Sequence, residues 1–324
     1  MSWRLLSRLG SPGAVRGNLT VLFFHRVFAE LDPLMPGEPT ACSFDAMLGW
    51  LQSQFQLLPL DQAVQMCAEG SLPPAAAAIT FDDGYRDNHA VAAPLLRRRG
   101  IPATFFIASR FLDGGLMWND GVAEALRQTR LDRLQMPELG LVDLPLAGWP
   151  ARSHAVATLL DKLKYLPPAE RDTAVRSVQT ACRTPPPTDL MMTSEQVRDL
   201  YQQGFGIGGH TCHHPILMTL PDAEAEREIA LGRADLQACT ESEVPLFAYP
   251  NGRLGKDYDA RHREMARRSG FKAGFTTEPG VCHRSSDLWA LPRFTPWNRD
   301  QWRFRLRLMQ NQWSRQPFES SRMP

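Results

Sequence analysis

The sequence predicts an α/β fold built on a mostly parallel sheet. Short apolar runs typical of buried strands alternate with stretches whose apolar residues recur every three or four positions, as in amphipathic helices. The 324 residues, 43% hydrophobic and 22% charged, are typical of a globular protein with a large core. This alternation over such a length favours strands joined by helical crossovers.

The expected elements fall into two series. The first contains strands at 21–25, 78–81 and 103–108, and helices at about 43–55, where Ser43 is the expected N-cap, and 87–99. The second contains a helix from Ser194, a strand at 205–209, a helix at 222–238, a strand at 246–249, a helix at 258–269, and strands at 272–276 and 288–291.

The stretch between the two series, at about 116–192, differs in composition. It is rich in Leu, Arg and Pro and has no run of β-branched residues, which predicts a mainly helical insertion. We therefore expect a single domain at 18–297 that this insertion interrupts. The segments 1–17 and 298–324 are expected to be peripheral tails, the first an untethered leader and the second a fraying helix.

Charge and composition exclude several classes of protein. The 36 Lys and Arg residues against 35 Asp and Glu residues leave a net charge of +1, so no basic surface for nucleic acid is expected. No apolar run approaches the roughly 20 residues of a membrane span. Arg4 and Arg8 interrupt any signal-peptide core, and the six cysteines form no C-x-x-C pair. These features predict a cytoplasmic protein with reduced thiols, with peripheral membrane association through a short N-terminal helix as an alternative.

The first candidate site follows the predicted strand 78–81. Asp82 and Asp83 come directly after it, and Gly84 is next. Parallel-sheet proteins usually carry their reactive groups at the carboxyl ends of strands, so this acidic pair is a candidate for metal binding or proton transfer. The alternative is a solvated turn in which Gly84 supplies the positive φ.

The second candidate site follows the predicted strand 205–209. His210 and His214 are four residues apart, close enough to bind one cation, and imidazole is a common metal ligand. If the segment stays extended, His210, Cys212 and His214 share one side and His213 takes the other, so Cys212 remains open as a ligand. Four protein ligands would indicate a structural site, whereas two imidazoles, one carboxylate and an open position would indicate a catalytic one.

A glycine pattern before the histidines suggests a cofactor that the context excludes. Residues 204–209 match G-x-G-x-x-G, but a dinucleotide fingerprint must follow a strand and open a helix. Here the pattern follows a helix and is itself the strand. Dinucleotide binding is therefore not expected.

Three motifs in order resemble a known family. They are Thr80-Phe-Asp-Asp-Gly84, His210-Thr-Cys-His-His214 and Phe247-Ala-Tyr-Pro-Asn-Gly252. Together they resemble the first three motifs of the polysaccharide deacetylases (NodB homology, carbohydrate esterase family 4), over roughly residues 20–115 and 190–295. The resemblance implies a distorted (β/α)7 barrel, a divalent metal that is often zinc, and hydrolytic removal of acetyl groups from N-acetylated sugars.

Roles for four residues are carried over from this resemblance. Asp83, His210 and His214 would ligate the metal, for which zinc suits two imidazoles and a carboxylate and cobalt, nickel or iron also fit. Asp82 would be the base that deprotonates the metal-bound water. The partner implied is an N-acetylated glycan or glycan precursor.

The substrate side of the site is expected from the third motif and the insertion. A backbone N–H near Tyr249 would complete an oxyanion site, in a turn shaped by Pro250 and Gly252. Trp118 would form a wall of the sugar groove; the alternative for this segment is a helix N-terminus with Asp120 as its cap.

Two departures from the family pattern concern the base and the acid. Family members carry an Arg where this chain has Phe247 and Ala248, and a His in a last motif that reads Leu291-Pro-Arg293 here. We expect Arg293 to orient Asp82; the alternative is a surface ion pair. We expect His25 to protonate the leaving amine; the alternative is a histidine hydrogen-bonded to a loop.

The function expected is that of a metal-dependent hydrolase that removes acetyl groups from N-acetylated sugars of a polysaccharide or glycan precursor. Two alternatives remain: a non-catalytic carbohydrate-binding relative, and a hydrolase of a non-sugar C–N bond on the same barrel. A glycosidase is disfavoured because the adjacent Asp82 and Asp83 cannot flank a glycosidic bond at the required separation.

Overall fold

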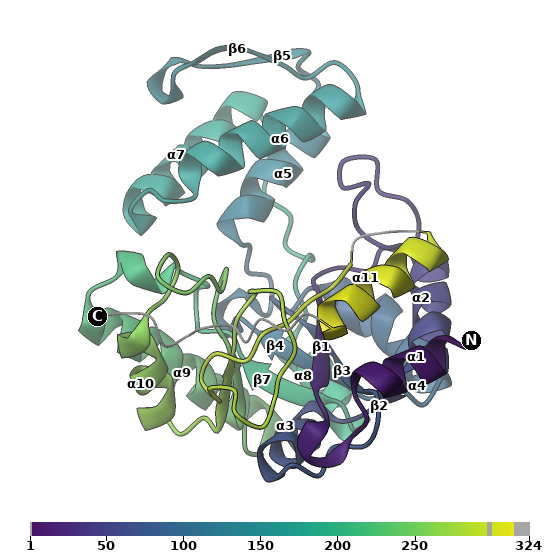
Figure 1. Cartoon of the computed structure of the whole chain (residues 1–324). Helices are drawn as coiled ribbons and strands as arrows, with labels where there is room; N and C mark the ends of the chain where they lie inside the picture. Colours follow the sequence, from purple (N-terminus) through teal and green to yellow (C-terminus); the bar gives the residue numbers. More distant parts are fainter. Residues whose placement is uncertain (1, 297–299, 314–324) are drawn as a thin grey trace.

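The centre of the computed structural model, which describes residues 2–296 and 300–313, is a curled seven-stranded sheet (Figure 1). All its pairings are parallel, which confirms the predicted fold class. Its strands are β1 (Leu19–Phe24), β2 (Gln56–Leu57), β3 (Ala76–Phe81), β4 (Ala103–Ile107), β7 (Gly206–Gly209), β8 (Leu246–Ala248) and β9 (Ala273–Phe275).

The strand order turns the sheet into a partly closed barrel. It runs β1-β3-β4-β7-β8-β9, with β2 beside β3. Residues 291–295 lie between the two ends of this order: Thr276 N–H donates to Leu291 O at 2.9 Å, and Phe294 N–H donates to Val21 O at 2.8 Å. The strand expected at 288–291 is wrong, because this segment makes only an isolated bridge and Pro292 has no N–H to continue a ladder.

Helices pack around the sheet, and the apolar residues at helical spacing face it. Phe44 at the start of α2 contacts Phe24 of β1 and Phe81 of β3 edge-on, with ring centroids 5.3 and 5.8 Å apart. These helices are α2 (Ala41–Gln54), α3 (Leu60–Glu69), α4 (Ala93–Arg98), α8 (Ser194–Gln202), α9 (Asp222–Thr240) and α10 (Ala260–Arg268).

Two helix starts differ from the prediction. The N-cap of α2 is Thr40 rather than Ser43; the Ser43 hydroxyl accepts the N–H of Thr40 and the Thr40 hydroxyl accepts that of Ser43, as in a capping box. The helix expected at 87–99 begins with a π-helical turn, Asn88–Ala92. Helix α3 was not predicted.

The insertion forms a separate lobe across the mouth of the barrel (Figure 1). It has the expected helices and its own apolar core, which includes Leu126, Leu159 and Val178. The antiparallel hairpin β5–β6 was not predicted, because alternation over four residues is too short to stand out in a Leu- and Arg-rich stretch. The elements are α5 (Trp118–Gln128), β5 (Arg133–Met136), β6 (Leu141–Pro145), α6 (Trp149–Leu163) and α7 (Pro168–Cys182).

The N-terminal segment is tethered, contrary to prediction. Helix α1 (Trp3–Gly10) packs against α11 (Gln301–Trp313). The amide of Gln312 donates to the carbonyl of Ser7 at 3.1 Å. The expected tail helix is α11, while residues 298–299 and 314–324 of that expected tail lie outside the described residues.

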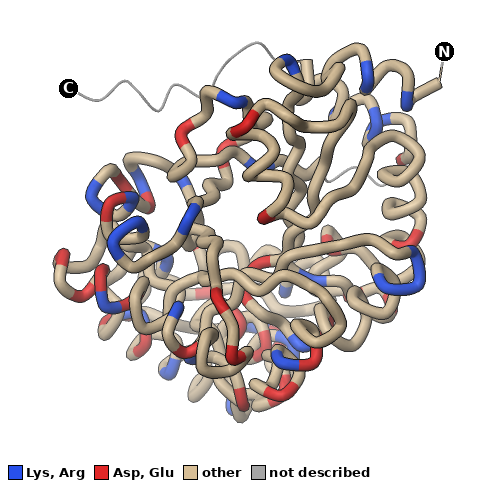
Figure 2. Tube along the Cα trace, turned by 90° about the horizontal axis from the view of Figure 1, so that it is seen from below, with Lys and Arg blue, Asp and Glu red and all other residues tan. Residues whose placement is uncertain are grey.

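Surface features bear on the expected location. Within residues 2–296 and 300–313, no helix is both long and apolar enough to cross a bilayer. Helix α1 exposes Leu5 and Leu9 beside Arg4, so peripheral membrane association stays a prediction, as does a cytoplasmic location. Basic and acidic residues are interspersed along the chain (Figure 2), and all six cysteines are free thiols.

Candidate metal centre

The ends of two strands bring together three potential metal ligands. Asp83 follows β3, and His210 and His214 follow β7, the strand on the other side of β4. Nε2 of each histidine lies 3.4 Å from Oδ1 of Asp83. One ligand atom from each residue lies within 4.8 Å of the others. These are the three residues that the resemblance implies as ligands.

The hydrogen bonding around this cluster fits a cation. Nδ1 of His210 lies 2.7 Å from the carbonyl of Ala248, which requires Nδ1–H and leaves the Nε2 lone pair of a neutral ring directed at Asp83. Oδ1 of Asp83 is buried and has no hydrogen-bond partner among the described residues. Acceptors that converge in a buried place are satisfied by a positive ion.

Left-handed backbone conformations orient the two histidines and keep the Cys212 side chain away from the cluster. Thr211 and His214 have φ values of 65° and 50°, so the segment is not extended and the expected alternation fails. The Cys212 sulfur instead lies 3.9 Å from Oδ2 of Asp235 on α9. His213 is exposed and pairs with α9. Among the described residues the cluster therefore has three potential protein ligands, and the alternative of Cys212 as a fourth is wrong.

Buried charges set the protonation of the cluster. Burial raises the pKa of Asp83, but the two histidines outweigh it and hold that pKa well below the usual range. Burial lowers the pKa of His214 to about 3. Burial also lowers the pKa of His210, but Asp83 and Asp82 overcome this and raise it. A divalent cation would therefore compete with a proton at His210.

Asp82 is held by a buried arginine from the segment that closes the barrel. Nη1 and Nη2 of Arg293 donate to Oδ1 and Oδ2 of Asp82 at 2.7 and 2.8 Å, and Nε donates to the carbonyl of Thr276 at 3.1 Å. Burial raises the pKa of Asp82, but Arg293 more than compensates and lowers it. Arg293 is 0% exposed, so the alternative of a surface ion pair is wrong.

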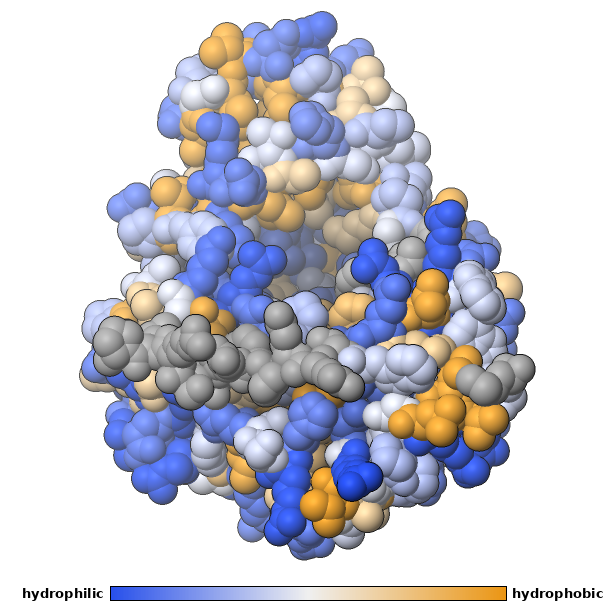
Figure 3. Space-filling model, viewed as in Figure 1, coloured by the Kyte–Doolittle hydropathy of each residue, from blue (hydrophilic) through white to orange (hydrophobic). Residues whose placement is uncertain are grey.

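A cavity of about 740 Å³ lies over the cluster, between the barrel and the insertion. It corresponds to the hollow between the upper lobe and the body in Figure 3. His25 and Trp118 line it together with Asp82 and the three potential ligands. The ring of His25 makes an edge contact with Phe23 and has no hydrogen bond to a loop in the described part of the chain. Both residues thus line the cavity over the cluster, while their expected roles stay predictions.

The third motif only partly meets its expectation. The N–H of Tyr249 donates to the carbonyl of Phe275 at 3.0 Å, and its ring stacks on Tyr258 away from solvent. This N–H is therefore not available as an oxyanion donor. Pro250 and Gly252 do shape a tight turn, in which the Gly252 N–H donates to Pro250 O at 2.7 Å.

The Gly252 conformation leaves no room for a side chain. Its φ is +72°, and a Cβ there would lie 2.8 Å from the nitrogen of Thr277. The turn brings Asn251, itself left-handed with a φ of 60°, to the wall of the cavity. Asn251 was not predicted as a site residue.

Asp120 is a titratable group of the cavity that the sequence did not identify as a site residue. It lies in the first turn of α5, whose N-cap is Met117, so the expectation of Asp120 as the cap is wrong. Its Oδ1 accepts from the Tyr85 hydroxyl at 3.2 Å, while Oδ2 is buried without a partner in the described chain. Burial raises the pKa of Asp120 from 3.8 to about 7, and its carboxyl group lines the same cavity.

We expect Asp120→Asn to change how stability depends on pH. The unfolded carboxyl loses its proton near pH 4 and the folded one near pH 7, so native stability falls as pH rises through this window. At 1.36 kcal/mol per pKa unit, the loss is about 4 kcal/mol, and the Asn variant escapes it. Urea unfolding of chelator-treated proteins between pH 4 and 8 measures the difference; parallel stability curves would contradict the prediction.

Comparison with known proteins identifies the chain. The family model described as polysaccharide deacetylase matches residues 69–135 and 147–274. The half-barrel of parallel strands, with its motifs at the strand ends, is thus the fold of the polysaccharide deacetylases, a class of hydrolases. The chain is a member of the polysaccharide deacetylase family, which confirms the resemblance predicted from the three motifs.

Individual relatives are distant. YxkH of Bacillus subtilis strain 168, whose name places it among the polysaccharide deacetylases, is 22% identical over 277 residues, 85% of this chain and 70% of YxkH. The deacetylase PplD of Streptococcus pyogenes superposes with a TM-score of 0.57 at 17% identity, covering 86% of this chain and 91% of PplD. IcaB of Ammonifex degensii gives 0.57 at 19% identity, covering 88% and 95%. These two structures share the fold of this chain.

Proposed function

We propose that this chain is a metal-dependent hydrolase that removes acetyl groups from the N-acetylated sugars of a polysaccharide or glycan precursor. The observation that carries the proposal is the convergence of Asp83, His210 and His214 beside a second buried carboxylate, in a cavity at the mouth of the barrel. Membership of the polysaccharide deacetylase family supports the reaction class.

The three ligands would hold a divalent cation, with zinc the first candidate and cobalt, nickel or iron compatible with the same donors. Such a cation supplies a nucleophilic water at neutral pH and polarises the amide oxygen of the substrate. With these three described residues as its protein ligands, the cation would keep a coordination position for water or substrate.

Asp82 and Arg293 would act as base and positioning residue. The carboxylate of Asp82 accepts a proton from the attacking water. Its bidentate pair with Arg293 fixes the plane of the carboxylate and keeps it ionised. The arginine that the third motif lacks is thus replaced, in this proposal, by one from the closing segment.

His25 would protonate the leaving amine. It lies at the carboxyl end of β1, lines the same cavity, and its ring makes no hydrogen bond to a described residue that would occupy it. Trp118, which lines the same cavity, offers an aromatic face against which the sugar ring would pack.

The test combines metal analysis with acetate release from N-acetylhexosamine oligomers. We expect one divalent ion per chain, and we expect His210→Ala to lose that ion and more than about 100-fold of activity, beyond the loss typical of an outer-sphere partner. His213→Ala is the matched control, because His213 lies in the same loop but is exposed and faces α9. His210→Ala with full metal and activity would refute the site. Wild-type protein that binds metal and glycan without releasing acetate would instead be a carbohydrate-binding relative.

A further inference from the structure

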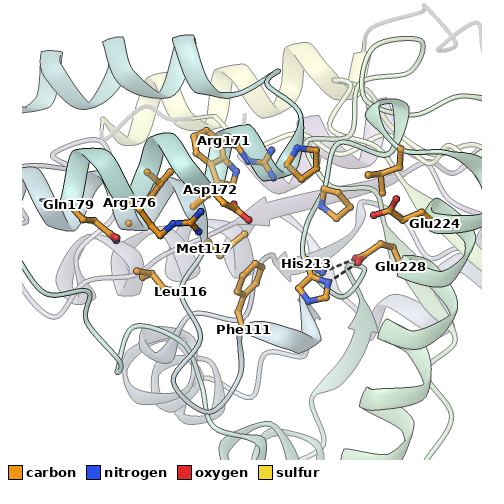
Figure 4. Close-up of a pocket in the computed structure, with 16 residues that line it drawn as sticks. Phe111, Leu116, Met117, Arg171, Asp172, Arg176, Gln179, His213, Glu224 and Glu228 are labelled. Atoms are coloured by element: carbon orange, nitrogen blue, oxygen red, sulfur yellow. Dashed lines mark hydrogen bonds and ion pairs between the residues drawn. The ribbon is translucent and has the colours of Figure 1, made fainter. Parts of the chain in front are cut away.

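A second cavity lies beside the candidate active site, between the insertion and the barrel (Figure 4). Its volume is about 380 Å³. Helix α7 forms one wall and α9 with the loop before it forms the other, while Phe111 and Leu116 provide apolar surface. No residue assigned above to metal binding or proton transfer lines this cavity.

The most unusual side chain in this cavity is Arg171 of α7. It is only 6% exposed, and its buried Nε has no hydrogen-bond partner in the part of the chain that the structure describes. Its guanidinium lies over the ring of Trp118, 5.1 Å from the ring centre. Burial lowers the pKa of Arg171, and Asp172 counteracts this only in part. A buried Nε–H without a hydrogen-bond partner is costly, so this geometry favours a ligand that supplies an acceptor.

The acidic groups nearby do not satisfy Arg171. Glu228 on the opposite wall is already occupied, since it accepts the N–H groups of Cys212 and His213 and pairs with the His213 ring at 2.7 Å (Figure 4). Asp172 and Glu224 are exposed to solvent. The group in this cavity that lacks a hydrogen-bond partner among the described residues is therefore the positively charged donor Arg171.

The two cavities adjoin at one pair of side chains. Met117 and Trp118 line both the cavity over the metal cluster and the cavity around Arg171. A glycan bound over Asp83 that extended past Met117 and Trp118 would bring a neighbouring unit to Arg171. The apolar surface of Phe111 and Leu116 suits the C–H face of such a unit.

We propose that the cavity around Arg171 is a subsite for a carboxylate-bearing sugar, so that the preferred substrate is an acidic glycan in which such sugars neighbour the N-acetylated ones. This inference rests on the proposed function. A guanidinium binds a planar carboxylate through two parallel hydrogen bonds. The subsite would therefore recognise charge and shape together, one sugar away from the bond to be cleaved.

The test measures equilibrium binding, which does not depend on turnover. The probes are oligosaccharides of alternating N-acetylhexosamine and hexuronic acid, and the same oligosaccharides with their carboxyl groups reduced to alcohols. Calorimetry with metal-loaded wild-type protein should show tighter binding of the acidic probe. Arg171→Met should weaken that binding by about 10- to 100-fold, the usual worth of a hydrogen bond to a charged group, and should leave binding of the reduced probe unchanged.

Two controls separate recognition from structure. Arg176→Met removes an exposed positive charge from the same helix and cavity, and it should leave the preference for the acidic probe in place. The melting temperature of Arg171→Met should not fall, because a buried Nε–H without a hydrogen-bond partner is replaced by an apolar side chain of similar length.

The outcomes distinguish this inference from the proposed function. Equal binding of the two probes by wild-type protein, binding of neither, or an equal loss on both in Arg171→Met would overturn the subsite. Acetate release from the oligosaccharides is recorded in parallel. Selective binding of the acidic probe without acetate release would support the subsite and count against the hydrolase. Acetate release from both probes, bound with equal affinity, would support the hydrolase and overturn the subsite.

Discussion

Asp82→Asn is expected to lower acetate release by about 10²- to 10⁴-fold, the usual contribution of a general base, while the metal content stays at the wild-type level. The amide cannot accept the proton of the attacking water. The metal is retained because Asp82 contacts Arg293 and is not among the three clustered ligands. Steady-state kinetics and metal analysis on the same preparation measure both quantities.

The neighbouring carboxylate provides the matched control. Asp83→Asn should lose metal and activity together, because Asp83 contributes the oxygen that both histidines face. Full activity in Asp82→Asn would refute its role as base. Loss of metal from Asp82→Asn but not from Asp83→Asn would mean that the two roles are exchanged.

Arg293→Met is expected to lower the free energy of unfolding by about 3–5 kcal/mol, the typical cost of removing one partner of a buried ion pair. Asp82, 2% exposed, would keep its charge without the guanidinium that binds both its oxygens. Urea unfolding at neutral pH measures the loss. The double variant Asp82→Asn/Arg293→Met should recover most of it, since no uncompensated charge is then buried.

The single variant Arg293→Met should also show a kinetic signature that a purely structural role would not produce. Arg293 lowers the pKa of Asp82, so its removal raises that pKa, and the base becomes protonated at higher pH. The acid limb of the kcat/KM profile should therefore move to higher pH in Arg293→Met. A destabilised variant with an unmoved acid limb would assign Arg293 a structural role alone.

The sequence was sufficient for the fold class and for the potential metal ligands. Buried parallel strands read as short apolar runs, and the carboxyl ends of such strands lie at one edge of a sheet. Asp83 and His210 follow two such runs, so they could be placed at the same edge before the strand order was known. The three ordered motifs then predicted the family, which the family match confirms.

Only the tertiary structure decided which groups surround those ligands. Arg293 is 211 residues from Asp82 along the chain, and it reaches the carboxylate because residues 291–295 lie between β9 and β1. The left-handed conformations of two residues keep Cys212 away from the metal cluster. Asp120 and Arg171 could be recognised as site residues only once their burial was known. Apolar periodicity is local and can be read from a few residues, whereas burial, charge pairing and backbone strain depend on segments that folding brings together from distant parts of the chain.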